Sequence, residues 1–172
     1  MVDIRPEEPA DRAAVRDVVL AAFGREVVAT LAEELPAGPS LVAVDDGRIV
    51  GHVRLSPSWV DAPRRLVDTL VLSPLSVAPQ RQKQGIGGAL VRAAIDAAAA
   101  AGAPQVFLEG SPVYYSRFGF VPGRPLGFTP PSVRIPDPAF QVVTLPADEP
   151  WMRGALVYTD VFWRHDCVGL RS

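Results

Sequence analysis

The sequence predicts a mixed α/β fold, built as one domain over residues 1–172. Segments with strand-like alternation and segments with helix-like periodicity follow one another, and no linker or internal repeat separates them. Asp46-Gly47 is a strong hairpin signal, and a polar loop joins an apolar strand to a glycine-rich helix start at residues 75–90. The length, with 48% hydrophobic residues, allows a sizeable core.

The periodicity also sets the order of the elements. They are a strand over 2–5, helices over 11–23 and 25–35, strands over 40–44, 48–55 and 66–77, a helix over 86–101, and strands over 105–109, 140–145 and 155–163. Asp11 is of a type that caps helix N-termini, so we expect it to cap the first helix. That helix carries an apolar stripe at Ala14, Val15, Val18, Val19 and Ala22.

The strands that follow the helices are predicted from a turn signal and from composition. Asp46-Gly47 lies between strands 40–44 and 48–55, so we expect these strands to be antiparallel neighbours. Pro74 lies inside strand 66–77 and cannot donate a hydrogen bond to a ladder. The ladder of that strand must therefore be open or bulged near Pro74.

Three glycines at the start of helix 86–101 point to a ligand. The alanines at 97–101 favour a helix by intrinsic propensity, but Gly85, Gly87 and Gly88 oppose one. Each glycine in a regular helix costs about 0.5–1 kcal/mol relative to alanine. Without Cβ atoms, however, a ligand can approach the main chain, and the unpaired N–H groups and helix dipole form an anion site. We expect a diphosphate here, with a simple helix cap as the alternative.

Two common phosphate-binding loops do not fit these residues. A Walker-type P-loop needs Gly-Lys-Ser/Thr, and Gly87 is followed by no such pair. The dinucleotide fingerprint is matched by Gly85 and Gly87, and Glu109 follows about 20 residues on, where a ribose-binding acid belongs. Leu90 replaces its third glycine, however, and residues 79–84 make the turn too long.

A third type of loop matches in order and spacing. Val77-Ala78-Pro79 and residues 82–87 resemble the V-x-P strand end and Q/R-x-x-G-x-G/A loop of the GNAT N-acetyltransferases. Downstream, residues 114–120 (YYSRFGF) resemble the Y-x-R-x-G-F segment of that family. Further similarity to its YhbS-like subgroup is found in GHVRLSP, LSPLSVAP, SPVYYSRFGF and RGALVYTDVFW. The resemblance covers nearly the whole chain.

This resemblance implies a fold and a co-substrate. The GNAT fold is a mixed, mostly antiparallel central sheet with about four flanking helices. In it, the parallel strands 66–77 and 105–109 splay apart to admit the pantetheine arm, and strands 140–145 and 155–163 form a C-terminal hairpin. Acetyl-CoA is the implied co-substrate, and the resemblance assigns its binding to Leu75, Ser76, Val77, Gln82, Lys83, Gln84, Gly85, Ile86, Gly87, Gly88 and Ser111.

The implied reaction is direct transfer of the acetyl group to a primary amine of a small molecule or a protein, within a ternary complex. A main-chain N–H on residues 75–77 would stabilise the negative oxygen of the reacting carbonyl. Tyr115 matches the position whose phenol protonates the departing thiolate, although packing of the aromatic cluster also explains it. Tyr114 is assigned to packing.

The base and the acceptor site are less defined. Val71 stands where some members of the family carry a glutamate that acts as the general base. The base that removes the amine proton is therefore left open among Glu109, Asp68 and water. We assign acceptor recognition to His52, Phe128 and Tyr158, together with the Pro-rich loop 122–138, for which a rigid surface loop is the alternative. A half-exposed strand histidine is the alternative for His52.

Composition excludes several other classes. A net charge of −2 and a pI near 5.7 argue against nucleic-acid binding, and the N-terminus lacks an apolar signal segment. The alanine-rich run is too short to span a bilayer, and Cys167 is the only cysteine, which favours a reducing, cytoplasmic setting. No metal site is expected, and a homodimer stays open. An acyl-CoA-binding regulatory module without turnover is the alternative function.

Overall fold

A computed structural model describes residues 1–171 as two compact units. Unit 1 comprises Met1–Ser56 and Leu72–Ala97, and unit 2 comprises Pro57–Val71 and the residues from Ala98 onward. Two long strands, β3 (Arg48–Asp61) and β4 (Leu66–Val77), contribute residues to both units. The expectation of one domain over residues 1–172 stays a prediction.

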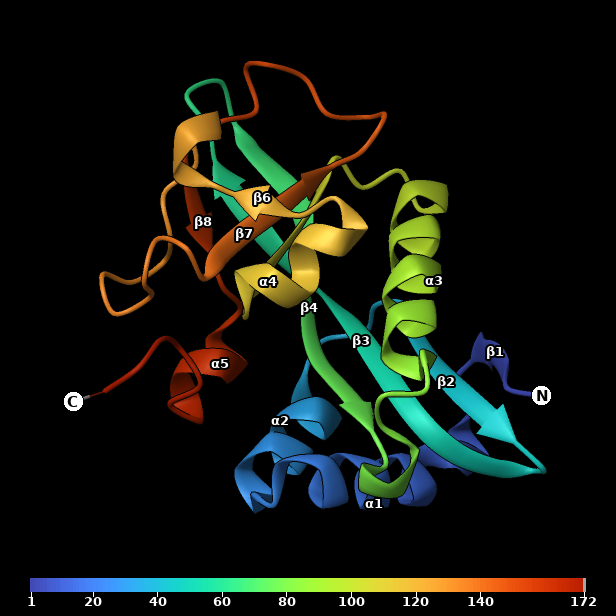
Figure 1. The fold of residues 1–172 in the computed structure, drawn as a ribbon. Helices are drawn as coiled ribbons and strands as arrows, with labels where there is room; N and C mark the ends of the chain where they lie inside the picture. The colour runs from blue at the N-terminus through green and yellow to red at the C-terminus, as the bar shows by residue number, and fades with distance from the viewer. Residues whose placement is uncertain (172) are drawn as a thin grey trace. The chain divides into compact units, whose positions relative to one another are not determined.

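Unit 1 begins with a short strand and two helices. β1 (Asp3–Pro6) and a 3₁₀ turn (Pro9–Asp11) lead into α1 (Arg12–Phe23), and α2 (Glu26–Glu34) follows and lies beside α1 (Figure 1). The apolar stripe of α1 is buried at Val15, Val18 and Val19, as its periodicity predicts. Gly24, with φ of 66°, ends the helix and donates its N–H to the carbonyl of Leu20.

Asp11 lies at the N-cap position of α1, as predicted, but it does not cap the helix through its side chain. Its carboxylate accepts the N–H of Glu8 at 2.7 Å and two bonds from the Arg5 guanidinium, at 2.7 and 3.0 Å. Asp11 therefore fixes the preceding 3₁₀ turn to β1, because a charged donor within reach competes better for the carboxylate than the neutral N–H groups of α1.

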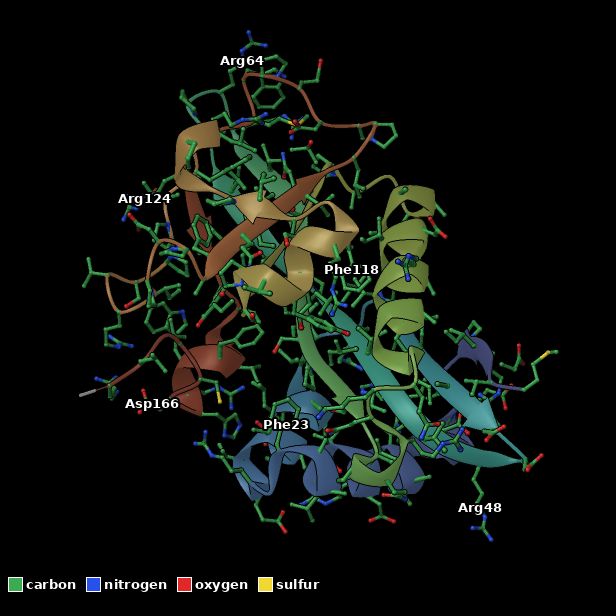
Figure 2. The ribbon with its side chains drawn as sticks, in the orientation of Figure 1. Phe23, Arg48, Arg64, Phe118, Arg124 and Asp166 are labelled. Carbon is green, nitrogen blue, oxygen red and sulfur yellow. The ribbon has the colours of Figure 1, made fainter. Side chains whose placement is uncertain are left out.

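The sheet of unit 1 has the order β1-β2-β3-β4. β2 (Ser40–Asp45) pairs antiparallel with both β1 and β3. Asp46 and Gly47 both have positive φ, 48° and 74°, so the predicted two-residue hairpin is confirmed. Figure 2 shows Arg48 at the end of this hairpin, pointing away from the sheet.

In unit 2 the strand order is β8-β3-β4-β5-β7-β6. β5 (Gln105–Glu109) follows α3 (Ile86–Ala100), and α4 (Pro112–Tyr115) and η3 (Ser116–Phe118) lead on to β6 (Val121–Pro122), β7 (Phe140–Thr144), β8 (Ala155–Val157) and α5 (Asp160–Arg164). β5 is parallel to β4 at only two positions, Leu70 with Val106 and Val71 with Phe107, as expected where parallel strands splay. Figure 1 shows α4 beside β6 and β7.

Two predictions for the strands need correction. β3 does not end at Leu55 but continues to Asp61, because its second half pairs with β8. The strand predicted over 155–163 ends at Val157, and no C-terminal hairpin forms, since β7 pairs with β5 and β6. Val161 and Phe162 are neighbours and both buried; a strand would point them to opposite faces, whereas α5 buries both.

Two properties of residues 1–171 bear on function. None of their helices combines the length and apolarity that a membrane crossing requires. Nor do they gather three or more His, Cys, Asp or Glu side chains in an arrangement that could hold a metal ion.

Candidate functional site

The loop between β4 and α3 belongs to unit 1 and has a distinctive backbone. Lys83 and Gly85 have positive φ values of 60° and 84°, and the loop is exposed from Gln82 to Gly85. The Gln82 amide donates to the carbonyl of Val77 at 3.1 Å, which ties the loop to the end of β4. These residues are predictable from the sequence because glycine and an amide side chain recur at defined spacing in such loops.

The first turn of α3 presents free backbone donors. The Ala89 N–H is the first to bond within the helix, to the carbonyl of Gly85 at 3.0 Å. The N–H groups of Ile86, Gly87 and Gly88 precede it and have no acceptor within the helix. Ile86 is buried and anchors the turn, whereas Gly87 and Gly88 are half-buried. An anionic ligand can therefore reach these donors.

The two cationic side chains of the loop, Arg81 and Lys83, differ in the bonds they make within the protein. Arg81 binds Asp45 at 2.6 Å and the Gln84 side chain at 3.1 Å, so its charge is largely used within the protein. Lys83 is exposed and makes no ion pair to any residue between 1 and 171. Of the two, Lys83 is the one available to a phosphate.

Gly51 on β3 was missed by sequence reasoning. A Cβ atom at Gly51 would lie 2.9 Å from Leu90 Cδ1 and 3.2 Å from both Ile86 Cγ2 and the Ser76 carbonyl oxygen. The glycine thus lets β3 approach the first turns of α3 and the end of β4. The available signal was a glycine inside a strand pattern, which often marks a close backbone approach.

The end of β4 carries Leu75, Ser76 and Val77. Ser76 is 1% exposed, and its hydroxyl has no hydrogen-bond partner within the described chain. The Ala78 N–H donates to the carbonyl of Val50 at 2.8 Å, so this part of β4 is held against β3. The end of β4, the loop and α3 thus form one continuous group within unit 1.

Tyr115 lies in unit 2, on α4. Ser111 begins this helix, and its hydroxyl accepts the N–H of Tyr114 at 3.3 Å. The Tyr115 ring packs edge-on against Tyr114 and Phe120, and a Cβ at Gly110 would lie only 2.6 Å from it. Its hydroxyl makes no hydrogen bond to residues 1–171. Burial raises the pKa of Tyr115 to about 12, so the phenol is protonated at neutral pH.

The other groups considered in unit 2 are engaged within the protein. Glu109 accepts the Tyr158 hydroxyl at 2.9 Å and the N–H of Gly169 at 3.1 Å, and burial raises its pKa. Tyr158 is 4% exposed. Phe128 is 1% exposed and packs edge-on against Phe107. Glu109 therefore has no oxygen free of partners to act as a base in this conformation.

His52 is more buried than either interpretation of the sequence implies. It is 1% exposed, so the half-exposed alternative is wrong. Its Nε2 lies 2.9 Å from the Ser40 hydroxyl and 3.3 Å from Glu7 Oε2, and its Nδ1 is buried without a partner. The hydrogen bond with His52 lowers the pKa of Glu7. Glu7 and Ser40 were missed, because no sequence spacing links them to His52.

A cavity of about 310 Å³ lies beside these residues in unit 1. Its walls come from the 7–33 region and from β3: Glu7, Arg12, Val15, Arg16, Val19, Ala29, Ala32, Glu33, His52 and Arg54. Along β3, Gly51 faces α3 while His52 and Arg54 face this cavity, as the alternation of a strand requires.

The chain is similar to known acetyltransferases in sequence. Residues 7–120 match the acetyltransferase (GNAT) family. The chain is 34% identical over 121 residues to the uncharacterized N-acetyltransferase YjhQ of Escherichia coli K12, a match covering 67% of each protein.

Solved structures are similar over almost the full length. The Escherichia coli GNAT family N-acetyltransferase YhbS, crystallised with CoA, has a TM-score of 0.86 and 28% identity, covering 95% of this chain and 92% of YhbS. A GNAT family acetyltransferase from Brucella melitensis, crystallised with acetyl-CoA, has a TM-score of 0.77 and 31% identity. The match covers 94% of this chain and 98% of the Brucella protein. The fold class predicted from the sequence is thereby confirmed.

Proposed function

Because the chain belongs to the acetyltransferase (GNAT) family, we propose that it binds acetyl-CoA and transfers the acetyl group directly to a primary amine of a small molecule or a protein. The observation that carries this proposal is the start of α3, where bare N–H groups follow a loop with two positive φ values. The CoA and acetyl-CoA found in YhbS and in the Brucella protein support it.

The loop residues fit the diphosphate of this co-substrate. The N–H groups of residues 86–88 would donate to its oxygens, with the positive end of the α3 dipole adding to the attraction. Lys83 supplies an unpaired cation. Gln82 holds the loop on β4, and Gln84 and Gly85 shape it. We assign Leu75, Ser76 and Val77 on β4, and Ser111 at the N-cap of α4, to the rest of the binding site.

Two groups of the chain would act on the reacting atoms. As the amine nitrogen bonds to the carbonyl carbon and the carbon–sulfur bond breaks, a main-chain N–H within residues 75–77 stabilises the negative oxygen. Tyr115 donates its phenolic proton toward the departing sulfur, since a phenol with a pKa near 12 is a donor throughout the neutral range.

Acceptor recognition is assigned to His52, Phe128 and Tyr158. His52 lies beside the cavity of unit 1. Phe128 and Tyr158 are buried, so we propose that they hold the loop 122–138 and the end of β8 in shape. Asp68 is exposed on β4, and water stays an equal candidate to take the amine proton.

A screen with thiol detection tests the proposed function. The protein is mixed with acetyl-CoA and a panel of amines, aminoglycoside antibiotics and peptides with free N-termini, and free CoA is measured. We expect release that depends on one class of acceptor. CoA-dependent thermal stabilisation without release for any acceptor would instead support the regulatory-module alternative.

A further inference from the structure

The cavity of unit 1 has donors that the protein leaves unused. Arg12 lines it and makes no ion pair or hydrogen bond within residues 1–171. Arg54 also lines it and donates through Nη2 to the carbonyl oxygens of Leu35 and Pro36, at 2.9 and 3.1 Å. Its Nε–H is buried without an acceptor, and a buried unsatisfied donor costs free energy. A ligand that accepts hydrogen bonds would offset this cost.

The charge of the cavity favours an anion near these two arginines. Burial lowers the pKa of the Arg54 guanidinium, and the nearby charge of Arg12 lowers it further, although Glu7 opposes both effects. The carboxylates of the lining are already engaged. Glu7 accepts the Ser40 hydroxyl, and Glu33 pairs with Arg16 at 2.8 Å. No carboxylate of the lining thus neutralises Arg12.

The remaining walls define the rest of the ligand. Four apolar side chains of α1 and α2 line the cavity: Val15, Val19, Ala29 and Ala32. They suit a small aliphatic group and not a second charge. The volume of about 310 Å³ admits a small molecule rather than a folded protein surface.

The position of the cavity connects it with the acetyl donor. β3 neighbours β4 in the sheet of unit 1, and the bond from Ala78 to Val50 fixes their alignment. That bond, and the 3.2 Å between the Gly51 Cβ position and the Ser76 carbonyl oxygen, place His52 near Ser76, within the β4 segment assigned to the reacting carbonyl. Arg54 lies two residues further along the same face of β3. An acceptor held at Arg54 could therefore extend past His52 toward β4.

We propose that this cavity is the acceptor site and that its occupant is a small amine bearing a carboxylate and an apolar side chain, an aliphatic amino acid being the simplest example. Arg12 and Arg54 bind the carboxylate, and the α1 and α2 side chains contact the aliphatic group. This inference rests on the proposed function and names the acceptor class of the same site.

Matched acceptors test the carboxylate. L-Leucine and L-methionine are each compared with the corresponding carboxamide, in acetyl transfer and in calorimetric binding to the protein with CoA. We expect kcat/KM and affinity to be at least tenfold higher for the carboxylates, the magnitude of a charge-assisted hydrogen bond. Arg12→Gln should remove this preference by raising KM for the carboxylate to the value for the carboxamide. Arg54→Lys, which retains charge but lacks the Nε–H donor, should reduce it in part.

Arg48→Gln is the matched control, because it removes the same charge from an exposed position at the β2–β3 hairpin (Figure 2). This variant should keep the parent's preference for carboxylate over carboxamide acceptors. Equal turnover or equal affinity for carboxylates and carboxamides contradicts the inference, while transfer to other amines keeps the proposed function. Carboxylate-selective binding without any transfer supports the cavity assignment and contradicts the proposed function.

Discussion

At the scale of single residues, the ring and the hydroxyl of Tyr115 have different surroundings. Tyr115 is half-exposed, so its hydroxyl has access to water and needs no partner within the protein. Here the ring is packed against Tyr114 and Phe120, but the hydroxyl makes no hydrogen bond within residues 1–171. Packing therefore accounts for the ring, and the described residues hold the hydroxyl by no hydrogen bond. We propose that the phenol serves a reacting group.

Tyr115→Phe should lower kcat by about 10²–10⁴-fold, the usual contribution of a positioned proton donor. The ring stays, and no hydrogen bond to the described residues is lost, so Tm and the affinity for acetyl-CoA should hardly change. The checks are steady-state kinetics and thermal unfolding on the same preparation. Tyr114→Phe is the control on the same helix. Unchanged kcat in Tyr115→Phe would remove this residue from the mechanism.

Gly51→Ala should affect both stability and binding of acetyl-CoA. The new methyl group would lie 2.9 Å from Leu90 and 3.2 Å from Ile86, the first residue of α3. Such overpacking costs about 1–3 kcal/mol, and moving α3 displaces the N–H groups of its first turn. Urea unfolding and calorimetry measure the two effects.

Gly47→Ala serves as the comparison for Gly51→Ala. Gly47 has a positive φ of 74° but open space around its Cβ position, so the Gly47→Ala protein should lose stability through backbone strain alone. Weakened acetyl-CoA binding in Gly47→Ala but not in Gly51→Ala would contradict the packing argument.

At the scale of elements, a side chain at the start of α1 connects that helix to a neighbouring strand. The Asp11 carboxylate binds Arg5 on β1 and the N–H of Glu8, so it connects β1 to the turn that precedes α1. The Arg5 guanidinium, with that N–H, lowers the pKa of Asp11 to about 2. A carboxyl group with a depressed pKa in the folded state stabilises the fold above its unfolded pKa and loses this contribution as the pH falls.

Asp11→Asn should therefore lower the free energy of unfolding by about 1–3 kcal/mol at pH 7, as expected for charge-assisted hydrogen bonds. The difference from the parent should shrink as the pH falls from about 4 toward 2, because the parent then protonates Asp11 as well. Urea unfolding at pH 7, 4 and 3 measures it. A difference that is constant over this range would show that the carboxylate charge does not contribute.

At the scale of the whole molecule, local patterns predicted most elements but not their long-range partners. The hairpin at Asp46-Gly47 and strand β5 were predicted because each depends on neighbouring residues. The end of β3 depends on pairing with β8, a segment nearly a hundred residues away, and could not be read from its own pattern. Residues 158–163 were predicted as part of a strand, but the neighbours Val161 and Phe162 are both buried by α5, and that burial depends on packing that their own pattern does not reveal.

The candidate site likewise has a part that was predictable from the sequence and a part that was not. The loop at 82–88 was predictable because one contiguous segment supplies glycines, loop and helix start. The group of His52, Ser40 and Glu7 joins three separate segments, and no spacing in the sequence relates them. Gly51 was visible as a glycine in a strand, but its partner, α3, was not.

Calorimetric titration of acetyl-CoA into Gly87→Val tests the central claim, that the first turn of α3 binds the diphosphate. An isopropyl group there blocks approach to the bare N–H groups while the helix end stays at the surface. Gly102→Val, just beyond the other end of α3, is the control: its positive φ of 78° makes the substitution cost stability, but the space around its Cβ position is open. We predict at least tenfold weaker binding, about 1.4 kcal/mol, for Gly87→Val and parental affinity for Gly102→Val. Parental affinity in a folded Gly87→Val protein would contradict the account.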